Sequence, residues 1–96
     1  MEIGQAIKKL REEKGFKQKE LSDSCNITQT YLSLIENGKK KPNVNLIENI
    51  GKNLGIPIQV ILFQSLTEND VDDSKKEIFR LMSPTINEFI RTVFIK

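Results

Sequence analysis

The stretch QKELSDSCNITQTYLSLIENG, residues 18–38, decides the fold of this 96-residue chain. It predicts two short helices, the first over about 18–25 and the second beginning after Thr28, a strong N-cap residue. Asn26 stands between them, and Asn adopts a positive φ more readily than any residue except Gly. The second helix is expected to stop at Asn37-Gly38.

Three further helices are expected around this pair. Apolar residues spaced as one helical stripe predict a helix over roughly 2–14, which Gly15 ends. Asn43 caps a fourth helix that closes at Gly55. A fifth, short helix opens at Pro57, because the missing N–H of a proline has no partner in a first turn. The apolar side chains expected to face the core are Ile3, Ala6, Ile7, Leu10, Leu21, Leu32, Ile35, Leu46, Ile47, Ile50, Leu54, Ile58, Ile61 and Leu62.

The C-terminal third has a different pattern. A polar, acidic break runs from Thr67 to Asp73. Ser74, with Glu77 three residues later, resembles a capping box that opens a helix, and Ser83-Pro84 interrupts this helix. A terminal strand over 92–95 is the alternative to a last helix. The cleanest helical stripe of the chain consists of Ile86, Phe89, Ile90, Val93 and Phe94.

The composition excludes several kinds of site. The chain has no His and a single Cys, Cys25, so one chain cannot assemble a His/Cys metal site, a Cys–His pair or a Ser-His-Asp triad. The acidic residues are scattered over predicted helical surfaces. We therefore expect no enzyme, no cofactor and no metal.

Hydropathy predicts a cytoplasmic protein. No apolar run approaches the ~20 residues of a membrane span. The N-terminus, Met1–Gly4, lacks the basic stretch and apolar core of a signal peptide.

The formal net charge of +2 is modest, but its distribution is uneven. Residues 1–58 hold ten Lys and Arg against seven Asp and Glu, whereas residues 59–96 hold five against six. The basic N-terminal segment could bind a polyanion, and the slightly acidic C-terminal segment could bind a protein partner. An ordinary solvated surface would explain the same charges.

The combination of Gln18, Glu36-Asn37-Gly38, the basic loop that follows and the five-helix spacing resembles the Xre/Cro-type repressor family over about residues 3–63. The resemblance implies an all-α protein. Its first part, 1–66, would be a five-helix, lambda-repressor-like DNA-binding domain, and 67–96 would be a C-terminal helical segment. The implied function is sequence-specific binding of double-stranded DNA by a transcriptional regulator whose recognition helix, about 28–36, lies in the major groove.

The resemblance also assigns roles to residues. Gln18 matches a family glutamine that contacts a phosphate and braces the recognition helix, while Gln29 and Thr30 match base-contacting positions. Arg11 and Glu36 match a structural ion pair. The remaining residues expected at the DNA are Thr28, a cap first and a phosphate contact second; Tyr31, through its hydroxyl or only by packing; Ser33; Leu34, at a thymine methyl or at the core edge; and Asn37, Lys39, Lys40 and Lys41, at the backbone.

Three positions depart from the family pattern. Lys17 replaces the usual Thr or Ser cap before Gln18, Ser22 replaces a small Ala, and Asn26 replaces a turn Gly. These changes are tolerable but suggest a less rigid unit. Cys25 falls at a small core-like site and is interpreted as a buried hydrophobe rather than a redox sensor.

One helix-turn-helix unit contacts few base pairs, so a homodimer on a palindromic operator is expected. The stripe of Ile86, Phe89, Ile90, Val93 and Phe94 would form the dimer contact, although the tail could instead fold back onto its own domain. The alternative function is a protein-interaction adaptor or antitoxin whose C-terminal helix binds a partner or antagonist protein. The sequence does not identify the operator, the regulated genes, an effector or the sign of regulation.

Overall fold

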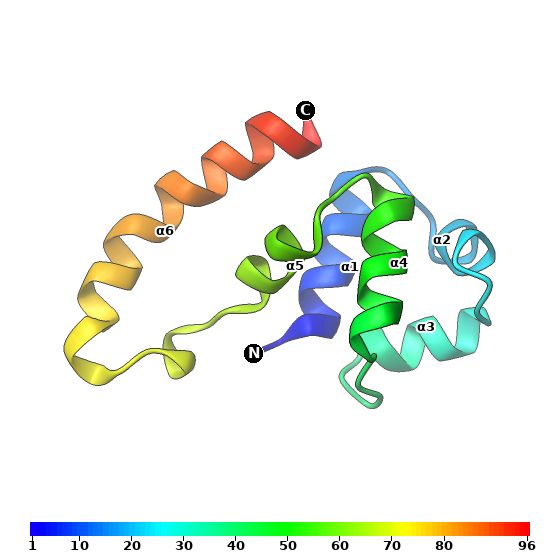
Figure 1. Ribbon diagram of the computed structural model, residues 1–96, viewed down its shortest axis with the longest axis horizontal. Coiled ribbons are helices and arrows are strands. Elements are labelled where there is room, and N and C mark those ends of the chain that lie inside the picture. The colour runs from blue at the N-terminus through cyan, green and yellow to red at the C-terminus, as the bar shows by residue number, and fades with distance from the viewer.

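The computed structural model describes residues 1–96, and all of its regular structure is helical (Figure 1). The first five helices are α1 (Ile3–Glu13), α2 (Gln18–Ser24), α3 (Gln29–Glu36), α4 (Val44–Leu54) and α5 (Ile58–Ser65). Two 3₁₀ turns follow, η1 (Glu68–Asp70) and η2 (Asp73–Lys75), and then α6 (Lys76–Ile90) and a π-helical turn, η3 (Arg91–Ile95). No α-helix of the structure combines the length and the apolar composition that a membrane span requires.

The predicted caps and turns of the five helices are confirmed. Asn26 has a φ of 58° between α2 and α3. Thr28 accepts a hydrogen bond from the backbone N–H of Tyr31 at 3.0 Å, and Asn43 accepts one from Leu46 at 2.8 Å. Gly55 ends α4 in the left-handed conformation, which a residue without Cβ adopts at little cost. These local devices explain why the helix boundaries could be predicted closely.

The core lies among α1–α5. Most of the apolar side chains expected there are buried, and Ile7, Leu21, Leu32, Ile35, Ile50 and Ile61 have no exposed surface. Four of the expected core residues are only half-buried: Ile3, Leu46, Ile58 and Leu62. The buried cluster takes Ile56 from the turn before α5 and Cys25 from the turn between α2 and α3.

The predicted break at Ser83-Pro84 is wrong, because α6 continues through it. Pro84 has no N–H for the carbonyl four residues earlier, which usually kinks or ends a helix. The apolar spacing is nevertheless continuous, since Phe79, Ile86 and Ile90 fall on one side of the helix. Ser83 donates its hydroxyl to the Phe79 carbonyl at 2.6 Å.

One other expectation for the tail is wrong, and the alternative to a last helix is excluded. The capping box of Ser74 and Glu77 does not form, because Ser74 lies inside the 3₁₀ turn η2 and α6 starts two residues later without a side-chain cap. The alternative of a strand over 92–95 is excluded, since these residues continue α6 as a π-helical turn.

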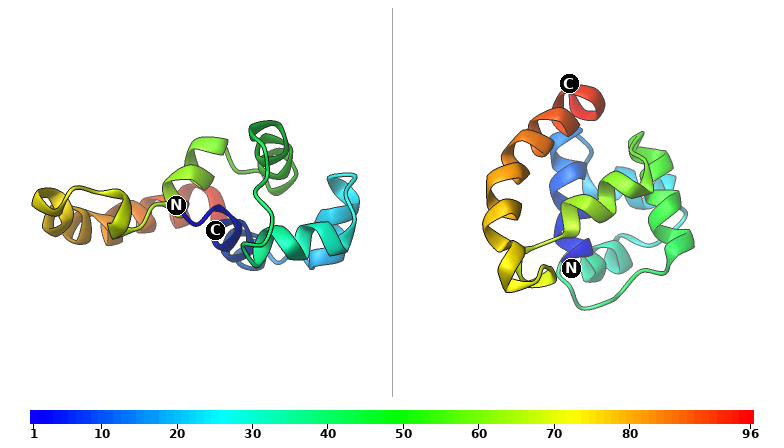
Figure 2. Two further views of the ribbon diagram at one scale, coloured as in Figure 1. Left: turned by 90° about the horizontal axis from the view of Figure 1, so that it is seen from below. Right: turned by 60° about the vertical axis from the view of Figure 1, so that its left-hand side comes forward.

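The linker and α6 fold back beside α1 and α5. Figures 1 and 2 show α6 at one end of the molecule and the α2–α3 pair at the other, with α1 between them. Gln64 of α5 donates to Asn87 of α6 at 2.7 Å, and Lys14 Nζ donates to the Phe94 carbonyl at 2.9 Å. Arg91 also forms an ion pair with Glu13.

Candidate nucleic-acid interface

The N-terminal turn of α3 projects its side chains into solvent. Gln29 and Thr30 are exposed, whereas Leu32 and Ile35 on the other side of the helix are fully buried. The buried side holds α3 against the core, so the outer side has a defined orientation. Because the Thr28 hydroxyl accepts the Tyr31 N–H, its first role is the cap.

A hollow of about 300 Å³ lies on this surface. Its lining residues are Gln18, Gln29, Thr30, Ser33 and Leu34. All five were predicted from the sequence to contact DNA. Amides and hydroxyls here offer both donors and acceptors, as recognition of a base edge requires.

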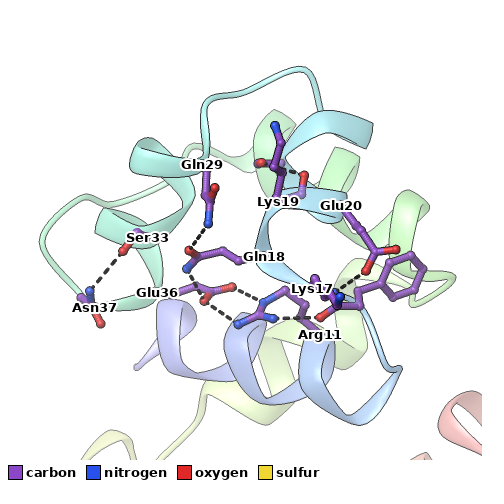
Figure 3. Close-up of polar contacts among 11 residues, drawn as sticks. Arg11, Lys17, Gln18, Lys19, Glu20, Gln29, Ser33, Glu36 and Asn37 are labelled. Carbon is purple, nitrogen blue, oxygen red and sulfur yellow. Dashed lines mark hydrogen bonds and ion pairs between the residues drawn. The ribbon is translucent and has the colours of Figure 1, made fainter.

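A chain of hydrogen bonds supports this hollow from beneath (Figure 3). Gln29 Nε2 lies 3.3 Å from Gln18 Oε1, and Gln18 Nε2 lies 3.1 Å from Glu36 Oε1. Glu36 in turn accepts from Arg11, from Nε at 2.8 Å and from Nη2 at 3.0 Å. The first side chain of α2 is thereby tied both to the first and to the last residue of α3.

The predicted pairing of Arg11 with Glu36 is present and almost dry. Arg11 is 7% exposed and Glu36 is 3% exposed. The hydrogen bond to Glu36 raises the pKa of the Arg11 guanidinium above its usual range, although burial acts in the opposite direction. Arg11 also donates to the Phe16 carbonyl at 2.8 Å, so it joins α1, the following turn and α3.

The basic loop follows α3 directly. Lys39, Lys40 and Lys41 are all exposed. The backbone N–H groups of Lys39 and Lys40 bond the Leu34 carbonyl at 2.9 and 3.2 Å, which turns the chain at the end of α3. Three cationic side chains thus follow the C-terminal end of α3, where the phosphates of a nucleic-acid backbone could contact them.

The other predicted residues of α3 differ in exposure. Tyr31 and Leu34 are half-buried, and the Tyr31 ring packs against the core. Asn37 is exposed and its amide lies 3.4 Å from the Ser33 hydroxyl, so these two side chains share one edge of the surface.

The positions that depart from the family pattern have local substitutes. The side chain of Lys17 cannot accept a hydrogen bond from the backbone N–H groups in the first turn of α2. The Glu20 carboxylate, however, accepts the Lys17 backbone N–H at 2.8 Å, which is half of a capping box. Ser22 is fully buried and donates to the Lys19 carbonyl at 3.0 Å. Cys25 is buried as expected, and burial raises the pKa of its thiol.

Two residues that place the helix pair were not recognised in the sequence. An ideal Cβ on Gly4 would lie 1.9 Å from the Ile35 carbonyl oxygen, so only glycine lets α1 approach α3 this closely. Asn49 of α4 donates to the Cys25 carbonyl at 3.1 Å and holds the turn between α2 and α3. A glycine inside a predicted helix was the available signal for Gly4, whereas Asn49 had none.

The predicted dimerisation stripe is divided between two sides of α6. Ile90 is buried within its own chain, with 5% of its surface exposed, and Ile86 and Phe94 are half-buried. Phe89 and Val93 are instead 62% and 52% exposed. They belong to a solvent-facing row, here called the outer face of α6, which consists of Ile78, Leu81, Met82 and Phe89 of α6 and Val93 of the following turn η3.

Comparison with known proteins gives a consistent result. The model of the helix-turn-helix family HTH_3 matches residues 7–61. The HTH-type transcriptional regulator YqaF of Bacillus subtilis (strain 168) is 38% identical over 69 residues, which are 72% of this chain and 90% of YqaF. The immunity repressor of Bacillus phage phi105 is 29% identical over 79 residues, and the transcriptional regulator SinR of B. subtilis is 34% identical over 61.

These alignments cover 80% and 62% of this chain but only 55% of the phi105 repressor and 55% of SinR. The chain therefore matches about half the length of these two relatives. The crystal structure of ClgR, a clp gene regulator from Corynebacterium glutamicum, shares the fold with a TM-score of 0.66 at 18% identity, over 99% of this chain and 93% of that one. The sequence relatives are transcriptional regulators, a family not known as enzymes.

Proposed function

This chain belongs to the helix-turn-helix family of DNA-binding transcriptional regulators, and from this premise we propose that it binds a palindromic operator as a homodimer. The observation that carries the proposal is the exposed start of α3, where Gln29 and Thr30 line a hollow, together with the three exposed lysines that follow the other end of this helix. The family match indicates that the ligand is DNA, and the geometry indicates which residues would contact it.

In this proposal α3 lies in the major groove. Gln29 pairs with the N6 and N7 edge of adenine, and Thr30 donates to a base or packs its methyl against thymine. Ser33 and Leu34 continue the same surface one turn later. These base contacts would determine the sequence specificity.

Contacts to the DNA backbone set the register. Gln18, whose second amide hydrogen is free, and Asn37 flank α3 and would meet phosphates together with Lys39, Lys40 and Lys41. Thr28 and Tyr31 contribute less, since the Thr28 hydroxyl is engaged in the cap and the Tyr31 ring is packed. Phosphate contacts give affinity that is independent of sequence.

The second copy would bind through the tail. We assign residues 1–66 to DNA and residues 67–96 to self-association. Ile90, with Ile86 and Phe94, supports the fold-back of α6 onto its own chain, while the outer face of α6 remains for a partner copy. Burying such side chains stabilises a pair by roughly 1.5–3 kcal/mol each. The ribbons of α6 and α3 lie at opposite ends of the molecule (Figure 2), so pairing through α6 would leave both recognition helices free.

The test is selection of bound fragments from random duplex DNA, followed by competition binding. The parent should yield an inverted repeat whose half-sites lie one helical turn, or a multiple of it, apart. Gln29→Ala and Thr30→Ala should each lose preference at one pair per half-site. Gln59→Ala, an exposed glutamine on α5 outside the site, is the matched control.

Two results would contradict the proposal. Selection of no sequence at low salt would refute operator binding. A non-repeated site bound by one copy, or a stoichiometric complex with a different protein in place of the pair, would refute the homodimer.

A further inference from the structure

A cleft of about 200 Å³ lies between α6 and the body that α1 and α5 form, and we propose that it binds a small aromatic carboxylate. Such a ligand would contact α6 and the body at once and would hold them together. The proposal goes beyond DNA binding, because no residue of this cleft is assigned to DNA or to the outer face of α6. The two proposals can therefore fail separately.

The walls of the cleft are apolar on both sides. Phe63 of α5 and Leu66, which follows α5, line it from the body, and Phe79 lines it from α6. All three residues are only half-buried, so part of each apolar side chain is left uncovered. A ring in the cleft would contact aromatic side chains of both helices, and contacts between aromatic rings add to the stabilisation that burial gives.

The space exists where α6 carries a small residue. Phe79, Ser83 and Asn87 follow one another at four-residue spacing, so they share one side of the helix, and all three line the cleft. Ser83 is the smallest of them, and its hydroxyl donates to the Phe79 carbonyl at 2.6 Å. The only buried residue of α6 is Ile90, which lies further along the helix. The part of α6 around Ser83 therefore has no fully buried contact with the body.

A cation without a partner lines the same cleft. Lys9 of α1 is exposed and forms no ion pair. Glu13, four residues further along α1, pairs with Arg91 instead. A negatively charged ligand in the cleft would thus become the charge partner of the Lys9 ammonium.

Two side-chain amides of the cleft supply hydrogen-bond donors. Gln64 Nε2 donates to Asn87 Oδ1 at 2.7 Å. Each amide has two N–H groups, so this bond leaves other N–H groups of the pair for an acceptor. An ionised carboxylate is such an acceptor, through both of its oxygens. The volume lies below the ~300–1,000 Å³ of most ligand pockets, so the ligand must be small.

The probe for the test is benzoate, which combines one ring with one carboxylate. Benzyl alcohol keeps the ring without the charge, and acetate keeps the charge without the ring. Isothermal titration calorimetry of the full chain, in the absence of DNA, should show saturable binding of one benzoate per chain. Benzyl alcohol should bind about fivefold more weakly, because it lacks the ion pair. Acetate should show no saturable binding, because it fills too little of the apolar space.

Variants of the cleft locate the binding. Lys9→Gln should weaken benzoate binding about fivefold, the upper range for an exposed ion pair. Lys8→Gln, at the exposed neighbouring position, is the matched control and should leave the affinity unchanged. Ser83→Leu fills the cleft and should abolish binding, whereas Ser74→Leu, outside α6, should not.

Stability and exchange measurements provide a second readout. Benzoate should raise the temperature of thermal unfolding of the parent but not of Ser83→Leu. It should also slow the hydrogen exchange of residues 76–90, because the ligand would hold α6 to the body. If Ser83→Leu does not fold, Lys9→Gln and the comparison with benzyl alcohol decide the question.

The absence of saturable benzoate binding by the parent overturns the inference. Equal affinities of the parent and Lys9→Gln, or unchanged binding by a folded Ser83→Leu, place the ligand elsewhere and overturn it as well. Binding that leaves the exchange of residues 76–90 unchanged refutes the bridging of α6 to the body. None of these results affects operator binding, and a parent that selects no DNA sequence would refute the proposed function but not the cleft.

Discussion

Arg11 Nε lies 2.8 Å from Glu36 Oε2, so the last turn of α1 is joined to the last residue of α3 by a nearly dry ion pair. A second bond from Arg11 Nη2 to Oε1, at 3.0 Å, makes the contact bidentate. Because the only other side-chain partner of Glu36 is Gln18, the pair also anchors the start of α2. Structural groups and the groups proposed to contact DNA therefore share one network of hydrogen bonds.

Arg11→Met should lower the free energy of unfolding by about 3–5 kcal/mol, because it leaves the Glu36 charge buried without its partner. Urea denaturation of the purified variant measures the loss. The double variant Arg11→Met with Glu36→Leu should recover much of it, since no charge is then stranded. Equal losses in the single and double variants would show that packing, not the charge, holds α1 to α3.

Lys39→Ala should weaken binding to specific and unrelated duplexes by similar factors, because a cation at a phosphate carries no sequence information. The slope of log K against log salt should become less steep by about 0.9 for each phosphate contact removed. Titrations at several salt concentrations test this prediction. Lys52→Ala, an exposed lysine on α4, is the control and should leave the slope unchanged. A selective loss at the operator in Lys39→Ala would instead place that lysine at a base.

Gly4→Ala should destabilise the protein by about 1–3 kcal/mol through overpacking, because the added Cβ would meet the Ile35 carbonyl oxygen, a backbone atom. Since Ile35 belongs to α3, operator affinity should fall as well. Gln5→Ala, at the exposed neighbouring position, should change stability by less than about 0.5 kcal/mol. Thermal unfolding and binding of both variants check the prediction, which fails if Gly4→Ala matches the parent.

Phe89→Asp should convert the proposed dimer into a monomer without loss of helix content, because this side chain is 62% exposed in the single chain. Analytical ultracentrifugation gives the mass and circular dichroism the helicity. Ser74→Asp adds the same charge outside α6 and should leave the dimer intact. A Phe89→Asp protein that stays dimeric would exclude the outer face as the interface.

Local chemistry explains why the helix-turn-helix was predictable. Asn26, Thr28, Asn43 and Gly55 each act within a few residues of their own position, through a positive φ or a cap. The residues around the hollow were predicted from the family resemblance, which covers the same segment; four of them lie on α3 and Gln18 lies on α2. The apolar pattern predicted the core side of α3, and the resemblance predicted the residues on its outward side.

In the C-terminal segment, residues 67–96, local sequence signals did not predict the structure correctly. Pro84 and the pair Ser74 and Glu77 carry signals for a break and a cap, yet α6 starts later than predicted and runs through the proline. A local signal of this kind is weak when the helix has a continuous apolar side that packs against the rest of the molecule, because tertiary packing contributes most of the stability of a helix. Periodicity also could not divide one broad stripe between Ile90, which is buried in its own chain, and Phe89, which is exposed.

The amino-acid sequence alone determined the five helices, their caps and the outward residues of α3, because backbone preferences and helical periodicity act over a few neighbouring residues. Apart from the Arg11–Glu36 ion pair, which the family resemblance implied, only the tertiary structure decided which groups meet across the molecule. Gln18 bonds Glu36 at 3.1 Å over 18 residues, and Lys14 bonds the Phe94 carbonyl at 2.9 Å over 80. Such contacts depend on how whole helices pack, and the close approach at Gly4 shows that a single absent side chain can set that packing.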